Sequence, residues 1–586
     1  MQQISDRISA LREWLELNKL AALVVPIADE FQTEYPFDHS KRLEWICGFK
    51  GSMGLAVIGL DQADFYRPGL YELQAKAQVD PVYNLKMMTR LGMCFDDEFC
   101  ESLPDNSLIA CDARLITPSE ANRFAEIAEK HGHQMEWLLF SPIDDLWEDQ
   151  PAANTRPLFA WPDAIAGQSS SSKRTQLGAT LGDADCTILN LGDSLSWLLN
   201  VRGYDAPTSP FTLSYGILHH NGEFDWFVEG GKLTDEVRAH VGDVRIHELD
   251  TFWDALPALK GRHVIIEDQS APFAVRLTLE NSGATVISGV DPCQAPKAEK
   301  HPSELTGIRA AHIRDGAYLS QYLCWLEQQL ANDLEVTELS AADQLTRFRA
   351  TDPLFHSVSF PPISAVGENA ALPHYHAEPD SNAQVRSTEC YLVDSGGQYL
   401  DGGTTDVTRS IWLEQPSAAY CDAYTRVLKG YIAIDQQRFP TGTTGAQLDP
   451  FARQFLWQVG KDYGHGTGHG VGAFLNVHEG PQRISPAGSV ALAAGNVLSN
   501  EPGYYLENHF GIRIENLVEI IELEDGLLGI SPLTLCPIDT RPIERNMLTD
   551  REASYLNDYH ARVLAETGPL VDPTTLEWLK QRCAAI

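Results

Sequence analysis

The chain has 586 residues, of which 44 are Lys or Arg and 81 are Asp or Glu, and its formal net charge is −37. This length allows about three or four domains, and so negative a charge disfavours nucleic acids and anionic membranes as partners. The 11 cysteines are scattered without a Cys-x-x-Cys pair, which is typical of reduced thiols. No apolar run approaches the roughly 20 residues of a membrane span, and the N-terminus does not resemble a signal peptide. We therefore expect a cytoplasmic protein.

The first 160 residues are predicted to form an α/β domain, because helical and strand patterns alternate along them. This alternation favours a mixed or parallel sheet. The expected elements are a helix over 6–17, strands over 21–25, 54–58 and 107–111, and a helix over 118–130.

A second α/β domain is predicted over 161–300. It opens on a polar stretch, 166–173, whose four consecutive serines predict a linker and mark the clearest boundary in the chain. Strand patterns then resume, in an order of elements similar to that of the first domain, at 186–191, 214–218 and 264–266.

The remaining residues, 301–586, are predicted to form a third domain. It begins with a long helix over 303–332 and continues as short strands and glycine-rich loops. The residues best suited to chemistry lie within this domain, between His374 and Glu515.

Two aspartates of this domain belong to strand-like runs. Asp394 lies near the end of the β-prone run 389–397, at a glycine turn, and Asp406 lies in the β-like segment 404–412. If these strands are neighbours joined by a short loop, the two carboxylates lie side by side. Close carboxylates repel, so one must hold a proton or the pair must bind a cation. Taken singly, either aspartate would more often be an ordinary surface residue of a loop.

Histidines and glutamates complete the set. His465, His469 and His478 fall within fourteen positions among glycines that permit close backbone approach, which indicates a site rather than a core. Glu501 and Glu515 each follow a short apolar strand, and a salt bridge to a neighbouring arginine is the alternative for either. Four carboxylates and one imidazole suit Mn²⁺, Co²⁺, Zn²⁺ or Fe²⁺. Two such ions, about 3.5–4 Å apart, could share carboxylates and hold a hydroxide between them.

This order of Asp, Asp, His, Glu and Glu resembles the metal ligands of the creatinase and methionine aminopeptidase superfamily, whose catalytic domain has the pita-bread fold. Within it, the chain is similar to the cytosolic Xaa-Pro aminopeptidases, the aminopeptidase P family. The most specific segments are His-Gly-Thr-Gly-His-Gly-Val-Gly at 465–472 and Asn-Val-His-Glu-Gly-Pro at 476–481. The resemblance covers almost the whole chain, and its other segments are 42–52, 193–203, 533–539 and 556–560.

The resemblance implies an α/β fold with two creatinase-like N-terminal domains, followed by a pita-bread catalytic domain with a C-terminal extension over about 525–586. It also assigns the metal ligands. Asp394 would chelate one ion, His469 and Glu501 would bind the other, and Asp406 and Glu515 would bridge the two. The implied cofactors are two divalent metal ions, Mn²⁺ first, with Co²⁺ or Zn²⁺ as alternatives.

The implied reaction releases the N-terminal residue from peptides whose second residue is proline. Since the bond to proline lacks an N–H, enzymes that read an extended backbone lose a hydrogen bond there. A hydroxide bridging the metals would attack the carbonyl, His478 would hydrogen-bond the oxyanion, and Glu501 would carry the proton to the proline nitrogen. His374 and His465 would position the substrate, and Arg513 matches an arginine beside the last ligand.

Two positions depart from the family pattern. Asp394 and Asp406 are twelve positions apart instead of eleven, because of an extra glycine in 401–404. A bulge or a wider loop could absorb this residue without moving either carboxylate. Leu70 stands where relatives commonly carry an arginine, so recognition is expected to differ if that arginine contacts substrate.

A prolidase-type dipeptidase is the nearest alternative, which the two N-terminal domains and the C-terminal extension disfavour. A catalytically inactive pita-bread protein that binds peptides or histones, or a creatinase-like hydrolase, is disfavoured because all five ligands are present. The expected partners are peptides with proline second and, because relatives suggest a homodimer, a second copy of the chain, without nucleic acid or membrane.

Overall fold

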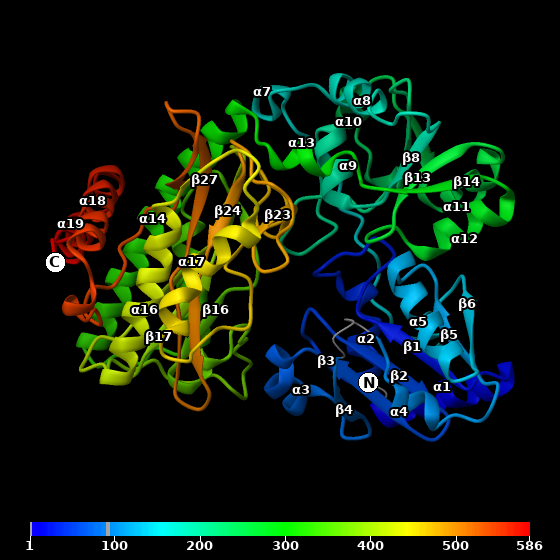
Figure 1. Cartoon of the computed structure of the whole chain (residues 1–586), viewed down its shortest axis with the longest axis horizontal. Helices are drawn as coiled ribbons and strands as arrows, with labels where there is room; N and C mark the ends of the chain where they lie inside the picture. The colour runs from blue at the N-terminus through cyan, green and yellow to red at the C-terminus, as the bar shows by residue number, and fades with distance from the viewer. Residues whose placement is uncertain (1–2, 89–93) are drawn as a thin grey trace. The chain divides into compact units, whose positions relative to one another are not determined.

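The structure, a computed structural model, describes residues 3–88 and 94–586, and the side chains of Leu70 and Leu73 lie outside that description. The departure at Leu70 is therefore not among the described features. The chain forms two compact units (Figure 1). The first consists of residues before Gln294 apart from two short segments, and the second of Gln294–Ile586 with those segments. Within the described ranges, no helix is long and apolar enough to cross a membrane.

The first unit contains two six-stranded mixed sheets with one topology. Their orders are β4-β3-β2-β1-β5-β6 and β12-β11-β10-β8-β13-β14, and in each the central strand, β1 or β8, pairs antiparallel on one side and parallel on the other. The first sheet comprises β1 (Ala22–Pro26), β2 (Leu55–Gly59), β3 (Ala63–Arg67), β4 (Asn84–Met87), β5 (Leu108–Asp112) and β6 (Gln134–Leu138). The second comprises β8 (Cys186–Leu189), β10 (Tyr215–His219), β11 (Phe224–Val228), β12 (Arg245–Glu248), β13 (His263–Glu267) and β14 (Thr285–Gly289). The predicted mixed sheets and their similar order of elements are confirmed.

The helices of the first unit form where apolar spacing and capping residues agree. Helix α1 (Ile4–Asn18) buries Ile8, Leu11 and Leu15, which recur on one face at helical spacing. Helix α5 (Pro118–Lys130) starts at a capping box in which Thr117 and Glu120 satisfy each other's free backbone donors. Both predicted helices are confirmed.

The predicted linker over 166–173 is wrong in its local structure. Ser169 is the N-cap of helix α8 (Ser170–Gly178), and its side chain accepts a hydrogen bond from the Ser172 backbone N–H. Serine is favoured in loops and also at N-caps, where its oxygen satisfies a free backbone donor. A run of serines therefore fits the start of a helix as well as a linker.

The second unit is built on the long helix α14 (Pro302–Ala331), which confirms the helix predicted over 303–332. Two small sheets have the orders β15-β18-β19 and β16-β17-β20, and a larger one runs β21-β28-β27-β24-β22-β23. The small sheets and a separate hairpin comprise β15 (Phe355–Val358), β16 (Ile363–Val366), β17 (Tyr391–Ser395), β18 (Gly397–Tyr399), β19 (Gly403–Thr404), β20 (Val407–Ile411), β25 (Gly503–Leu506) and β26 (Phe510–Arg513). The larger sheet comprises β21 (Arg438–Phe439), β22 (Gly468–Gly470), β23 (Glu479–Ile484), β24 (Val497–Asn500), β27 (Asn516–Glu522) and β28 (Leu528–Pro532).

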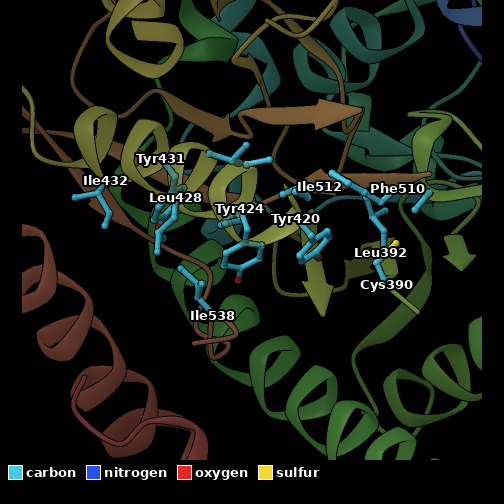
Figure 2. Packing of buried hydrophobic residues seen from close by; sticks show 14 of the residues in the cluster. Cys390, Leu392, Tyr420, Tyr424, Leu428, Tyr431, Ile432, Phe510, Ile512 and Ile538 are labelled. Atoms are coloured by element: carbon cyan, nitrogen blue, oxygen red, sulfur yellow. The ribbon is translucent and has the colours of Figure 1, made fainter. Parts of the chain in front are cut away.

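Four further helices accompany these sheets: α15 (Glu338–Arg349), α16 (Ala418–Asp435), α17 (Gly445–Trp457) and α18 (Asp550–Thr567), before the last helix α19 (Pro573–Arg582). The core around α16 is shown in Figure 2, where Tyr420, Tyr424 and Leu428 of this helix pack with residues of β17, β26 and the segment after β28. Their spacing of four residues places them on one face of the helix. This core holds β17 and β26, the strands that carry Asp394 and Arg513.

Asp394 and Asp406 belong to one antiparallel hairpin. Strand β17 pairs with β20, with Asp394 opposite Thr408, and β18 pairs with β19, with Tyr399 opposite Gly403, in one continuous register. Because residues two apart on a strand face the same way, Asp394 and Asp406 are diagonal neighbours on one face. The predicted proximity of the two aspartates therefore follows from the pairing.

The extra glycine lies at the tip of this hairpin. Leu400, Asp401 and Gly402 connect the two strands, and Gly402 has a φ of 109°, a value that favours glycine. The tip is held by an ion pair between Asp401 and Arg314 of α14, at 2.8 Å. The paired strands on either side of the tip keep one register, which is compatible with the predicted loop and shows no bulge in this pairing.

Helix α18 carries a buried histidine whose ionisation opposes folding. His560 Nε2 accepts a hydrogen bond from the Ile538 N–H, 3.1 Å away. Burial, followed by the charge of Arg409, lowers the pKa of His560 to about 4. Between about pH 6.5 and 4 the unfolded chain therefore binds a proton that the folded chain does not, and stability falls as pH falls through this window.

We expect this group to remove on the order of 3 kcal/mol of stability between pH 7 and pH 4. His560→Gln keeps a carbonyl oxygen as acceptor for Ile538 but cannot titrate, so the variant should lose a smaller part of its stability in acid. Urea unfolding followed by tryptophan fluorescence at several pH values measures the difference. Parallel pH profiles for the two proteins would contradict the assignment.

Candidate metal centre

All five predicted ligands belong to the second unit, and each lies in, or beside the end of, a short strand. Asp394 is in β17, Asp406 directly precedes β20, and His469 is in β22. Glu501 directly follows β24, and Glu515 lies between β26 and β27. Strand ends suit this purpose because their side chains are held by the sheets while the adjoining backbone can bend around a ligand.

Three of the five form a compact donor cluster. One ligand atom from each of Asp406, His469 and Glu515 lies within 4.8 Å of the other two. His469 Nε2 is 3.5 Å from Asp406 Oδ2 and 3.4 Å from Glu501 Oε1, which brings the second glutamate to the same place. Three of the predicted ligands thus form one cluster, and a fourth, Glu501, contacts its histidine.

Asp394 is joined to this cluster through Arg513. One of its oxygens, Oδ2, accepts a hydrogen bond from Arg513 Nη2 at 2.6 Å. The other, Oδ1, is buried and has no hydrogen-bond partner among the described residues. A buried carboxylate oxygen without a partner is costly, and a cation at this point would remove that cost.

The acidity of these groups reflects their crowding. Burial and repulsion from Asp406 raise the pKa of Asp394 to about 7, although Arg513 opposes the shift. Burial, followed by repulsion from Asp406 and Asp394, raises the pKa of Glu515 well above its usual value. A divalent cation favours the ionised form of both groups. An oxygen-rich site with one imidazole therefore fits the predicted pair of divalent ions.

Thr408 links Glu515 of the donor cluster to Arg513, the partner of Asp394. Its hydroxyl donates to Glu515 Oε2 at 2.6 Å and accepts from Arg513 Nε at 2.9 Å. The sequence interpretation missed this residue, although it follows Asp406 by two positions on a strand and therefore shares its face. Ser499 was missed in the same way, and its hydroxyl accepts from the His469 N–H and donates to Glu501.

The predicted substrate-site residues lie around the same centre. His465 Nε2 is 2.9 Å from the Tyr505 hydroxyl, which accepts a hydrogen bond from Arg513 Nη1 at 2.7 Å. Burial and the neighbouring Arg513 and His478 lower the pKa of His374 to about 4, so this imidazole is neutral near pH 7. Tyr505 was not predicted, because a tyrosine on a short hairpin has no sequence signal that separates it from a packing residue.

His478 and Glu501 both contact His469. The rings of His478 and His469 meet edge to face with centroids 4.3 Å apart. Burial alone would raise the pKa of Glu501, but electrostatic interactions with its neighbours, first His469 and then His465 and Arg513, outweigh burial and lower it. The structure thus brings together every residue of the predicted set.

Family comparisons agree with this architecture. Residues 306–522 match metallopeptidase family M24, and residues 526–586 match the C-terminal region of peptidase M24. Residues 7–138 and 149–304 each match a creatinase/prolidase N-terminal domain. The class of protein is therefore a metallopeptidase with two creatinase-type N-terminal domains, and the predicted fold class is confirmed.

Relatives that match over the whole chain indicate which family of M24 metallopeptidases the chain belongs to. Over 99% of its length the chain is 36% identical to a probable Xaa-Pro aminopeptidase P of Laccaria bicolor, covering 94% of that protein, and 37% identical to one of Fusarium vanettenii, covering 99%. The crystal structure of an X-prolyl aminopeptidase from Caenorhabditis elegans, described as a cytosolic enzyme with a di-nuclear active site, matches with a TM-score of 0.94 and 31% identity over 100% of both chains. The chain belongs to the aminopeptidase P family of M24 metallopeptidases.

Proposed function

We propose that this chain is a metal-dependent aminopeptidase that releases the N-terminal residue from peptides with proline in the second position. The observation that carries the proposal is the convergence of Asp406, His469 and Glu515, whose ligand atoms lie within 4.8 Å of one another. The names of the full-length relatives, Xaa-Pro aminopeptidases, support the substrate class.

Two divalent metal ions would be held by Asp394, Asp406, His469, Glu501 and Glu515. When bound, such a pair polarises the scissile carbonyl and lowers the pKa of water to make a nucleophile near neutral pH. Mn²⁺ is the first choice because oxygen donors predominate, with Co²⁺ or Zn²⁺ as alternatives. The di-nuclear site named for the Caenorhabditis elegans enzyme supports two ions rather than one.

The surrounding residues would stabilise the oxyanion, transfer the proton and orient the substrate. His478, whose ring contacts that of His469, would donate a hydrogen bond to the oxygen that becomes negative in the transition state. Glu501, whose pKa is lowered by its neighbours, would accept a proton and pass it to the proline nitrogen. The neutral imidazoles of His374 and His465 would orient the peptide without repelling its amino group.

The wider organisation follows the sequence interpretation. We place domain boundaries near residues 160 and 300, with a C-terminal extension over about 525–586, close to the ends of the matched family segments. The description of the Caenorhabditis elegans enzyme as cytosolic supports a cytoplasmic location. The proposed assembly is a homodimer.

The decisive experiment compares three substrates. Metal-stripped protein with added Mn²⁺ should release arginine from Arg-Pro-Pro at least about 100-fold faster than from Arg-Ala-Ala, as expected of an enzyme that selects proline in the second position. Omission of Mn²⁺ is the control, and it should abolish release. Turnover confined to the dipeptide Arg-Pro would make the protein a prolidase. No turnover with Mn²⁺, Co²⁺ or Zn²⁺ would overturn the proposal.

A further inference from the structure

Two buried asparagines stand directly beside two of the proposed metal ligands. Asn500 precedes Glu501 and Asn516 follows Glu515, and both side chains are fully buried. The two asparagines are opposite each other in the pairing of β24 with β27. Whatever orients these amides therefore also orients the backbone from which both glutamates project.

Helix α16 contacts both amides. Asn500 Nδ2 donates to Asp435 Oδ1 at 2.8 Å, and Asn516 Nδ2 donates to the Tyr431 hydroxyl at 2.6 Å. That hydroxyl in turn donates to Asp435 Oδ2 at 2.9 Å. These three hydrogen bonds link the four side chains in a row, while Asn500 Oδ1 has no hydrogen-bond partner among the described residues. Buried hydrogen bonds of this kind restrict the orientation of the groups that they join.

Helix α18 adds two tyrosines to this network, one at Asp435 and one at Asn516. The Tyr555 hydroxyl donates to Asp435 Oδ2. The Tyr559 hydroxyl accepts from Asn516 Nδ2 at 3.1 Å and lies 2.9 Å from the carbonyl oxygen of Cys536, to which it donates. Both tyrosines therefore come from the segment that matches the M24 C-terminal region.

A buried arginine, Arg409, connects Tyr559 and Asn516 to the backbone of Glu515. Arg409 Nη2 donates to Asn516 Oδ1 at 2.8 Å and to the Tyr559 hydroxyl at 3.2 Å. Its other terminal nitrogen, Nη1, donates to the backbone carbonyl of Glu515 at 2.7 Å. The Tyr559 hydroxyl is thus two contacts away from the backbone of a proposed bridging ligand.

We propose that Tyr555 and Tyr559 of α18 are positioning residues for the metal centre. They act through Asn500 and Asn516, and they set the orientation of the backbone at the two glutamates. The inference rests on the proposed function, because it takes those glutamates as metal ligands. Residues behind a ligand typically contribute about 10- to 100-fold to metal affinity when they fix its orientation.

The test measures Mn²⁺ binding to metal-stripped protein by isothermal titration calorimetry, for Tyr555→Phe, Tyr559→Phe and the double variant. Each change removes one hydroxyl and leaves the ring in place. We expect the double variant to bind at least one of two Mn²⁺ ions about 10- to 100-fold more weakly. Tyr420→Phe is the matched control, since the Tyr420 hydroxyl is buried and has no hydrogen-bond partner among the described residues. This control should bind as the wild type does.

A second control separates positioning from simple docking of α18. Lys429 of α16 forms an ion pair with Glu552 of α18 at 2.6 Å, outside the tyrosine and asparagine network. Lys429→Met should lower the unfolding temperature while leaving Mn²⁺ affinity unchanged. The inference is overturned if the tyrosine variants bind Mn²⁺ with wild-type affinity, or if Lys429→Met weakens binding as much as they do. If the wild-type protein binds two Mn²⁺ ions but does not cleave Arg-Pro-Pro, the proposed function is wrong and the inference about the tyrosines still stands.

Discussion

Replacement of His469 by alanine is expected to lower kcat on Arg-Pro-Pro by about 10³-fold or more, because a bound metal contributes several kcal/mol to the transition state. His469 provides the only imidazole among the proposed ligands, and its Nε2 lies between Asp406 and Glu501. The fold should tolerate the change. The other ring nitrogen, Nδ1, is 3.0 Å from the Gly470 carbonyl oxygen, and a hydrogen bond of this kind contributes about 1 kcal/mol.

The measurement is steady-state hydrolysis at saturating Mn²⁺, with metal content determined on the same samples. His509→Ala is a matched control, because His509 is exposed and its Nδ1 also contacts a backbone carbonyl, that of Glu507, at 2.9 Å. The control should keep two bound ions and wild-type kcat. If His469→Ala retained both, the imidazole would not be a ligand and the assignment of the cluster would fail.

Replacement of Arg349 by leucine is expected to cost about 3–5 kcal/mol of stability. Arg349 of α15 and Asp315 of α14 are both buried, with Arg349 Nε 2.7 Å from Asp315 Oδ1. Burial alone would raise the pKa of Asp315, but the charge of Arg349 outweighs burial and lowers it. Without the guanidinium, the carboxylate keeps only its hydrogen bond from Tyr399, and an unpaired buried charge remains.

Urea unfolding at pH 7 measures this effect. Arg347→Leu, two residues away on the exposed face of α15, is the control and should change stability by less than about 0.5 kcal/mol. Adding Asp315→Asn to Arg349→Leu should restore part of the loss, because the remaining group is then neutral. Equal stabilities for Arg349→Leu and Arg347→Leu would show that the ion pair contributes nothing.

The sequence predicts the elements of this chain where local signals and tertiary packing agree. The helix over 118–130 has apolar spacing and a capping box, and its structure coincides with the prediction. The serines at 169–172 carry a signal shared by loops and N-caps, so local sequence alone could not choose between them. Only the packing of α8 against its neighbours makes the helix the stable choice.

In the candidate site, too, local sequence predicts some residues, and others depend on tertiary packing. Glycine-rich motifs and strand ends mark the five residues in the chain, and the resemblance to the aminopeptidase P family implies their roles as metal ligands. Thr408 could have been found from strand periodicity, since it follows Asp406 by two positions. Tyr555 and Tyr559 could not, because they reach the centre from a helix more than thirty positions further along the chain than Glu515. Their connection depends on how α18 docks on α16, which no local pattern encodes.

The hairpin that carries Asp394 and Asp406 also bears on how the length of this segment can vary during evolution. Its paired register continues from the aspartates to Tyr399 and Gly403, and the additional residue is confined to the tip beyond them. Insertions at a loop tip leave the paired strands in place and are usually tolerated. Selection on catalysis can therefore hold the two carboxylates fixed while the tip gains or loses residues. We therefore expect one more position between these two proposed ligands to leave both carboxylates in place.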